Sequence, residues 1–390
     1  MTQTSNRVRT LAPGGDDGWA IFHRARAMRA AGVSLADLTV GDHDIGTDPA
    51  ILTAMDAAAR GGHTGYAAIA GTDGLRDAIA ARVSTRTGVA TTRDNVLVTT
   101  GGQAALFAAA MACIDPGGRI LFPDPYYATY PGTVRAAGGT PVPVPTRPED
   151  GFQPRRAALE AAGPADALLI NTPSNPTGAV YDADTMDQIA QFATANDAWL
   201  ISDEVYDTQV WSGTHVSPRA LPGMAERCFV VGSMSKSHAM TGSRIGWLIG
   251  PEAAIADLIV LVTHTTYGVP GFIQDAAEFA LSRGDAFEAA IAAPFLARRD
   301  ACLAVLAEQS VVGVIPSGGA MYLMLDIRAT GMSAFDFAAH LLEAHHIAVM
   351  PGDSFGKAAA GHLRVALTQP EERLIPALTT ILSVAKEMAA

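Results

Sequence analysis

Cysteine is scarce in this chain, which has three cysteines, Cys113, Cys228 and Cys302, among its 390 residues. They lie far apart, are odd in number and lack the paired spacing of a zinc site. We therefore expect neither a disulfide framework nor a bound metal. This cysteine usage is typical of a reducing compartment, so we expect a cytoplasmic protein.

Long apolar runs and an excess of basic residues are absent as well. The longest uncharged apolar run, residues 104–114, is too short to span a bilayer, and no apolar signal core precedes Asp16. With 27 basic against 39 acidic residues the formal net charge is -12, and such a surface repels phosphate groups. We expect neither a membrane nor a nucleic acid as a partner.

The arrangement of apolar stretches predicts an α/β fold. Hydrophobic residues make up 49% of the chain, and its length favours two or three domains. From residue 95 onward, short apolar stretches alternate with helical ones, which predicts a mainly parallel sheet covered on both faces. The expected strands are residues 95–100, 119–122, 167–171, 199–202, 228–231 and 245–249, and the expected helices are residues 103–113, 127–137 and 183–194.

The last third of the chain has a different pattern, with longer helices and fewer strands. We expect a smaller α+β domain there. Its expected helices are residues 251–263, 272–282, 286–308, 334–344 and 371–388, and its expected strands are residues 320–326, 348–350 and 363–366. A helix is also expected over residues 19–31. It should pack on this smaller domain, because a lone amphipathic helix must bury its apolar face.

Lys236 lies just past the expected strand 228–231, in the sequence Val-Gly-Ser-Met-Ser-Lys-Ser. Open α/β sheets place their ligands at this end of their strands. A phosphate-binding P-loop requires glycine directly before its lysine, and Ser235 occupies that position, so the P-loop interpretation fails. Two interpretations remain. Lys236 is either an ordinary loop lysine or an imine-forming nucleophile whose neighbouring serines bind a phosphate.

Two other strand ends carry polar side chains. Asp203 and Tyr206 follow the strand 199–202, and Asn175 lies in a turn rich in proline after the strand 167–171. Such groups can simply cap helices or form turns. Alternatively, Asp203 could keep the ring nitrogen of pyridoxal 5′-phosphate (PLP) protonated, so that the ring acts as an electron sink. Asn175 and Tyr206 could then hydrogen-bond the phenolate oxygen of that cofactor.

Further candidates are weak when each is taken alone. Gly101-Gly102 opens a helix whose N-terminus could bind a phosphate. Tyr127 could stack on an aromatic ring, and Arg244 could neutralise a phosphate. The planar guanidinium of Arg364 could bind a carboxylate through two parallel hydrogen bonds. Each of these residues could equally serve the structure alone.

Taken together and in this order, the motifs resemble the class I/II aminotransferases of PLP fold type I. The resemblance runs from about Leu38 to the C-terminus and is carried by Tyr66 to Gly71, Gly101-Gly102, Tyr127, Asn175-Pro-Thr-Gly178, Asp203-Glu-Val-Tyr206, Ser233-x-Ser-Lys236, Arg244 and Arg364. It implies an N-terminal arm and helix over residues 1–45, a large domain over 46–270 with a seven-stranded, mainly parallel sheet, and a small α+β domain over 271–390.

The resemblance also implies a role for each matching position. Lys236 would form a Schiff base with PLP and move the proton between Cα and C4′, Asp203 would pair with the ring nitrogen, and Asn175 and Tyr206 would hold the phenolate oxygen. The other implied cofactor-binding residues are Gly102, Gln103, Ala104, Tyr127, Ser233, Ser235 and Arg244. Asn175 and Arg364, together with the backbone of Gly41, would bind the substrate, with Arg364 on its α-carboxylate.

The implied activity moves the α-amino group between an L-amino acid and a 2-oxo acid such as 2-oxoglutarate or pyruvate. Tyr66 would reach the phosphate of a neighbouring subunit, which implies a homodimer. Family members that prefer dicarboxylates often have lysine where this chain has Gln103, and their usual Gly-Glu-Pro-Asp is Gly41-Asp-His-Asp44 here. We therefore predict that neutral or small donors are preferred over aspartate. His43 could accept a substrate group or be a loop residue.

Three alternatives differ in their support. A PLP-dependent C–S lyase or decarboxylase would share the fold and the lysine, so it stays open. A PLP-sensing transcription regulator would need a DNA-binding module, and the residues before the large domain show no helix-turn-helix pattern. A nicotinamide oxidoreductase is disfavoured because the chain lacks the Gly-x-Gly-x-x-Gly fingerprint at a strand–helix junction.

Overall fold

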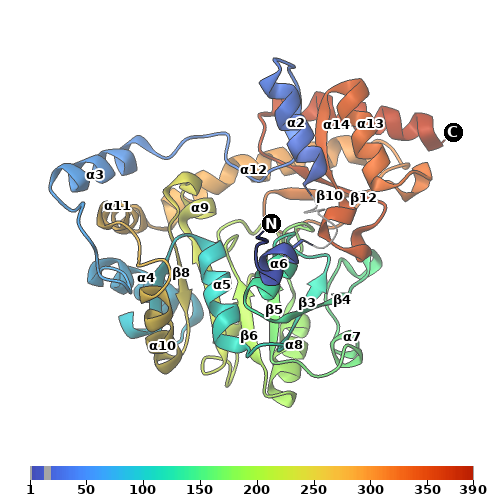
Figure 1. Cartoon of the computed structure of the whole chain (residues 1–390). Helices are drawn as coiled ribbons and strands as arrows, with labels where there is room; N and C mark the ends of the chain where they lie inside the picture. The colour runs from blue at the N-terminus through green and yellow to red at the C-terminus, as the bar shows by residue number, and fades with distance from the viewer. Residues whose placement is uncertain (1, 13–18, 390) are drawn as a thin grey trace.

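The computed structural model describes residues 2–12 and 19–389. Two sheets organise the chain, and helices surround them (Figure 1). The larger sheet has seven strands in the order β2-β8-β7-β6-β5-β3-β4, which confirms the predicted seven-stranded sheet. Its strands are β2 (Val96–Thr99), β3 (Arg119–Asp124), β4 (Thr140–Pro145), β5 (Ala167–Asn171), β6 (Trp199–Asp203), β7 (Cys228–Ser233) and β8 (Gly246–Ile249).

The seven-stranded sheet is parallel except for β8, which runs antiparallel to both of its neighbours. The central strands β5 and β7 are buried along their whole length, because helices cover both faces and leave no face for polar residues. One face packs against α5 (Gly102–Cys113), α6 (Tyr130–Ala136) and α10 (Glu252–Thr263). The other packs against α3 (Pro49–Arg60), α4 (Asp73–Thr87), α7 (Arg156–Ala161), α8 (Ala183–Ala195) and α11 (Gly271–Ser282).

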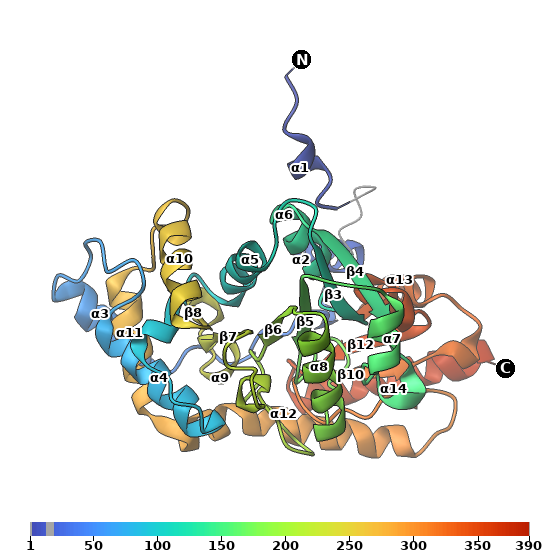
Figure 2. The same cartoon turned by 90° about the horizontal axis from the view of Figure 1, so that it is seen from below.

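The second sheet has five strands in the order β1-β11-β12-β10-β9. These are β1 (Ala36–Leu38), β9 (Gly313–Val314), β10 (Tyr322–Asp326), β11 (Ile347–Pro351) and β12 (His362–Ala366). Its core includes residues of α2 (Ala20–Ala30), α12 (Gly284–Ala307), α13 (Ala334–His345) and α14 (Glu371–Ala389). Ile21 and Ala25 of α2 are buried in this core. The short helix α1 (Asn6–Arg9) instead projects beyond α6 (Figure 2).

Several elements differ from those expected. Strand β4 was not predicted, because its sequence Thr-Pro-Val-Pro-Val-Pro is rich in proline, which a central strand does not tolerate. β4 lies at the edge of the sheet, where proline is tolerated. The helix expected over residues 127–137 begins only at Tyr130, because Pro131 favours the first turn of a helix. Tyr127 therefore lies in the loop before α6 and is free to face the adjacent cavity.

The division of the chain into domains stays a prediction. Helix α11 follows residue 270 but packs against α3 and α4, beside the seven-stranded sheet. Helix α12 continues from there and places Phe295, Cys302 and Leu306 in the core of the five-stranded sheet. In both Figure 1 and Figure 2, α12 runs from one sheet toward the other. We propose a large domain and a small domain, one around each sheet, that are joined along α12.

None of the helices in the described part of the chain combines the length and the apolar character needed to cross a membrane.

Candidate active site

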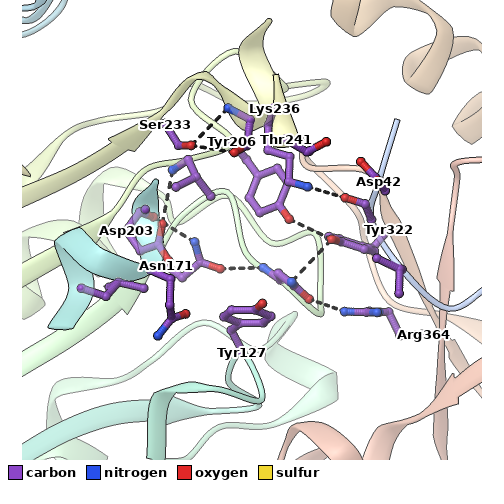
Figure 3. A pocket seen from close by; sticks show the side chains of 18 of the residues that line it. Asp42, Tyr127, Asn171, Asp203, Tyr206, Ser233, Lys236, Thr241, Tyr322 and Arg364 are labelled. Carbon is purple, nitrogen blue, oxygen red and sulfur yellow. Dashed lines mark hydrogen bonds between the residues drawn. The ribbon is translucent and has the colours of Figure 1, made fainter. Parts of the chain in front are cut away.

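A cavity of about 320 Å³ lies between the two sheets, at the carboxyl ends of the parallel strands (Figure 3). Asn171, Asp203 and Ser233 end β5, β6 and β7, and the five-stranded sheet contributes Tyr322 and Arg364. Parallel α/β sheets bind their ligands at this position. The cavity brings together most of the predicted site residues, namely Gly41, Gly102, Gln103, Tyr127, Asn175, Asp203, Tyr206, Ser233, Ser235, Lys236, Arg244 and Arg364.

Two predicted residues do not line this cavity. Ala104 lines an adjoining outer hollow of about 930 Å³, which Gln103 and Arg244 also border. Tyr66 is 91% exposed and packs its ring against Tyr267 instead. The side chain of Gln103 is held by hydrogen bonds to Thr129 and Thr133.

Lys236 belongs to the short helix α9 (Met234–Ser237), which follows β7 directly. Its Nζ donates a hydrogen bond to the carbonyl oxygen of Gly41. Burial lowers the pKa of Lys236 to about 8; the carboxylate of Asp42 opposes this shift, and the positive charges of Arg364 and Arg244 add to it. A lysine with a lowered pKa has more neutral amine near pH 7, which is the nucleophilic form.

His43 contacts the backbone of this lysine. Its Nε2 lies 3.1 Å from the carbonyl oxygen of Lys236, and its ring meets the edge of Phe295 at a centroid distance of 5.1 Å. Burial and the charge of Lys236 lower the pKa of His43 to about 4, so the ring is neutral near pH 7. A neutral ring that bonds a carbonyl must carry its proton on Nε2. His43 therefore holds the backbone turn of Lys236 and does not line the cavity.

Asp203 is 4% exposed and forms no ion pair with any described residue. It accepts hydrogen bonds from the hydroxyl of Tyr130 at 2.7 Å and from the backbone N–H of Val205 at 3.3 Å. Burial raises the pKa of Asp203 to about 6, because these hydrogen bonds only partly replace water. Tyr130 was not expected here, because nothing in the sequence distinguishes it from the neighbouring tyrosines as the partner of Asp203.

A hydrogen-bonded group of four side chains lies in the same cavity. The hydroxyls of Tyr206 and Tyr322 are 2.8 Å apart, and Nδ2 of Asn175 lies 3.5 Å from the hydroxyl of Tyr322. Oδ1 of Asn175 accepts a hydrogen bond from Nη1 of Arg364 at 2.8 Å. Tyr322 was missed from the sequence, although a single tyrosine at the start of an otherwise apolar strand was the available signal.

Arg364 is 1% exposed and has no carboxylate partner among the described residues. Its guanidinium lies 4.6 Å from the ring centre of Tyr322 and 4.4 Å from that of Phe355. It donates to the carbonyl oxygen of Thr39 as well as to Asn175, while its Nε has no partner. Burial lowers the pKa of Arg364 because a charge away from water is costly.

Arg244 likewise has no carboxylate partner in the part of the chain that the structure describes. Its guanidinium donates to the backbone carbonyls of Thr241 at 2.9 Å and Thr100 at 3.4 Å. Gly101 has a φ of +82°, and a Cβ there would lie 2.4 Å from Nη2 of Arg244. Glycine therefore lets the arginine approach the N-terminus of α5, where the first N–H groups lack partners within the helix.

These charges show what kind of ligand completes the site. Arg364 needs an anion and Asp203 needs a cation, because both are buried and a buried charge is stable only when paired. The exposed guanidinium of Arg244 has no carboxylate partner among the described residues and can also take an anion. PLP fits this donor set. Its phosphate suits Arg244, the N-terminus of α5 and the hydroxyls of Ser233 and Ser235, which are 2.9 Å apart. Its protonated ring nitrogen suits Asp203, and the carboxylate of an amino acid suits Arg364.

Comparisons with known proteins agree with this chemistry. The family "Aminotransferase class I and II" matches residues 34–381. An arginine–pyruvate transaminase, AruH, from Pseudomonas aeruginosa is 39% identical over 386 residues, which cover 98% of both chains. An aspartate/prephenate aminotransferase from Thermus thermophilus is 35% identical over 97% of both chains. The structure of an aspartate aminotransferase from Thermus thermophilus with maleate superposes with a TM-score of 0.92, at 34% identity, over 99% of this chain and all of that one.

The chain belongs to the class I and II aminotransferases. It is a PLP-dependent enzyme that acts on amino acids and 2-oxo acids, and its fold is that of the aspartate aminotransferases. The predicted family, fold class and cofactor are thereby confirmed.

Proposed function

We propose that this enzyme takes the α-amino group from L-amino acids without a side-chain carboxylate and passes it to a 2-oxo acid. Pyruvate is the acceptor that the name of the Pseudomonas aeruginosa relative suggests, and 2-oxoglutarate is the other candidate. The observation that carries the proposal is the single cavity in which Lys236, Asp203 and Arg364 meet.

The reacting groups follow from the charges of the cavity. When bound, PLP supplies an electron sink next to the substrate. The ionised carboxylate of Asp203 keeps a proton on the ring nitrogen, which that electron sink requires. With PLP bound, the Nζ of Lys236 would move the proton between Cα of the substrate and C4′ of the cofactor, a role that its lowered pKa suits.

The remaining residues bind and orient the two ligands. Arg364 binds the α-carboxylate of the substrate, and Gly41 approaches it with its backbone. A Cβ at Gly41 would lie 1.9 Å from the hydroxyl of Tyr322, so only glycine allows this approach. Asn175 and Tyr206 would donate to the phenolate oxygen, and Tyr127 would stack on the ring. Gly102, Gln103, Ser233, Ser235 and Arg244 would bind the phosphate, with Ala104 next to them.

The preference among donors follows from what the cavity lacks. Gln103 is neutral, and Thr129 and Thr133 already hold its amide. In the described part of the chain, the arginines that line the cavity are Arg244 and Arg364, and both are assigned to other groups. The second carboxylate of aspartate therefore finds no unassigned arginine among the described residues that line this cavity.

A panel of amino acids tests this proposal. Each is mixed with the PLP-loaded enzyme without an acceptor, and the loss of visible absorbance is followed in time. Alanine should react faster than aspartate. A faster reaction with aspartate than with any neutral donor would contradict the proposed preference, and no reaction with any amino acid would contradict the proposed function.

The lowered pKa of Lys236 predicts how PLP attaches to the PLP-free protein. The neutral amine is the attacking form, so the rate should fall about tenfold for each pH unit below about 8 and level off above it. Stopped-flow absorbance after mixing with PLP measures this profile. A midpoint near 10.5, the ordinary value for lysine, would show that the cavity does not depress the pKa.

We also propose a homodimer in which Tyr66 reaches the phosphate site of the partner subunit. Tyr66 and Tyr267 form an exposed aromatic pair, and Val260 on α10 is exposed as well. Exposed aromatic and apolar side chains such as these are typical of an interface. Sedimentation equilibrium should give twice the mass of one chain, and Tyr66→Ala should weaken the binding of PLP. A monomer with full PLP affinity would contradict this arrangement.

We propose a cytoplasmic location because the cysteines form no disulfide among the described residues. Cys113, Cys228 and Cys302 are free and buried, which suits a reducing compartment. Fractionation of the source cells, followed by an assay of the enzyme in each fraction, tests this location.

A further inference from the structure

The carbonyl oxygen of Lys236 is held from outside its own helix. It lies in the last turn of α9, where carbonyl groups lack partners within the helix. Nε2 of His43 supplies the donor at 3.1 Å, although the two residues are 193 positions apart in the chain. This hydrogen bond fixes the backbone from which the lysine side chain extends into the cavity.

The turn that follows Lys236 needs support of this kind. Ala239 has a φ of +51°, a left-handed conformation that is costly for a residue with a Cβ atom. The carbonyl of Ala239 accepts a hydrogen bond from Oγ1 of Thr47 at 2.7 Å. The segment 41–47 therefore holds the turn 236–239 at two of its carbonyls.

The segment 41–47 is itself anchored to the rest of the fold. Asp44 forms an ion pair with Arg298 of α12 at 2.6 Å, and Arg298 also donates to the carbonyl of Leu367 at 3.0 Å. Arg298 is buried, so salt screens this pair less than it screens a pair at the surface. The hydrogen bond from His43 to the lysine backbone thus comes from a segment that is fixed in place.

The N–H group is what histidine adds at position 43. Nδ1 of His43 is buried and has no hydrogen-bond partner among the described residues, which costs free energy. Phenylalanine could make the same edge contact with Phe295 without that cost. The proline of the family's usual Gly-Glu-Pro-Asp turn has no N–H to donate. The feature that sets histidine apart here is therefore its hydrogen bond to Lys236.

We propose that His43 is a positioning residue for Lys236, and that its hydrogen bond to the lysine backbone sets where Nζ lies in the cavity. The inference rests on the proposed role of Lys236 in amino-group transfer. His43 does not line the cavity and acts through the backbone of the lysine. Because proton transfer depends steeply on the distance between the two atoms that exchange the proton, a small shift of Nζ slows it.

Two substitutions separate the hydrogen bond from the ring. His43→Phe keeps the ring and loses the donor, whereas His43→Gln loses the ring and keeps an amide N–H at about the same reach. In single-turnover absorbance with saturating alanine, His43→Phe should react about tenfold more slowly, and His43→Gln should react within about twofold of the unmodified enzyme. His345→Phe is the matched control. His345 is exposed at the end of α13 and does not line the cavity, so its replacement should leave the rate unchanged.

A second readout needs no amino acid and so separates this inference from the proposed function. The pH midpoint for attachment of PLP to the PLP-free protein reports the pKa of Lys236, which is about 8. Asp42, Arg364 and Arg244 are the charged groups that act on Nζ, and both variants retain them. His43 is neutral in this pH range, so its loss removes no charge. His43→Phe should move the midpoint toward 10.5, because a freed turn lets the ammonium group reach water, and His43→Gln should leave it near 8.

The pH midpoint also separates positioning from a merely structural role, which would lower the melting temperature and leave the midpoint in place. His43→Asn serves if His43→Phe does not fold, because its amide is one methylene shorter than that of glutamine and should not reach the carbonyl. A midpoint that stays near 8 in a folded variant without the donor overturns the role of His43. A folded His43→Gln that behaves like His43→Phe also overturns it. Failure of every amino acid to bleach the absorbance of the unmodified enzyme overturns the proposed function, and the midpoint still tests His43.

Discussion

Replacing Lys236 by alanine should lower the rate of amino-group transfer by at least about 10⁴-fold, because a positioned proton carrier and nucleophile is lost at once. Its Nζ is the amine in the cavity, and its pKa of about 8 suits it to take a proton near neutral pH. Single-turnover absorbance with a reactive donor measures the loss. The secondary structure should stay intact, because the side chain makes one hydrogen bond, to Gly41.

Lys357→Ala is the matched control for this variant. Lys357 is exposed, and its hydrogen bond to Asp124 uses its backbone N–H, which alanine retains. The control should turn over at the rate of the unmodified enzyme. If Lys236→Ala kept more than about a tenth of the activity, the assignment of Lys236 as proton carrier would be wrong.

Replacing Asp203 by asparagine should lower the rate of transfer by about 10³-fold. Asparagine has nearly the same shape and can still accept the hydrogen bond from Tyr130, but it has no charge to keep the ring nitrogen protonated. The expected signature is a loss in kcat with little change in KM for the donor, since Asp203 lies away from Arg364 in the cavity.

The same substitution should have the opposite effect on the stability of the PLP-free protein. The pKa of Asp203 is raised from 3.8 to about 6, so the folded protein binds this proton more tightly than the unfolded chain does. Its favourable contribution is present below about pH 4 and is lost as the pH rises through 6. The melting temperature of Asp203→Asn relative to the unmodified protein should therefore increase between pH 4 and 7. A fully active Asp203→Asn variant would contradict this role. So would a difference in melting temperature, variant minus unmodified protein, that is smaller at pH 7 than at pH 4.

The sheet could be predicted largely because each of its central strands begins with a run of apolar residues. Strands β5, β6 and β7 were each expected within two residues of their observed ends. Helices and strands without such an apolar run were harder to predict. β1 has three residues and gains its stability from pairing with β11, which follows it by about 300 residues in the chain.

The site was predictable where a residue lies at the end of a strand or inside a motif. Lys236, Asp203, Asn175 and Arg364 all meet in one cavity as expected. Tyr322 could not be placed because its contacts with Tyr206 and Asn175 join positions 116 and 147 residues apart. The ring of His43 was assigned to the cavity mouth or a loop, and only the fold shows that it bonds the backbone of Lys236.

The small number of lysines makes the central claim directly measurable. The chain contains three, Lys236, Lys357 and Lys386. Borohydride reduction of the PLP-loaded protein fixes the cofactor to the lysine that holds it, and peptide mass spectrometry then identifies that lysine. We predict that the added mass lies on the peptide containing Lys236 and is absent from Lys236→Ala. An adduct on Lys357 or Lys386, or one that persists in Lys236→Ala, would contradict the account.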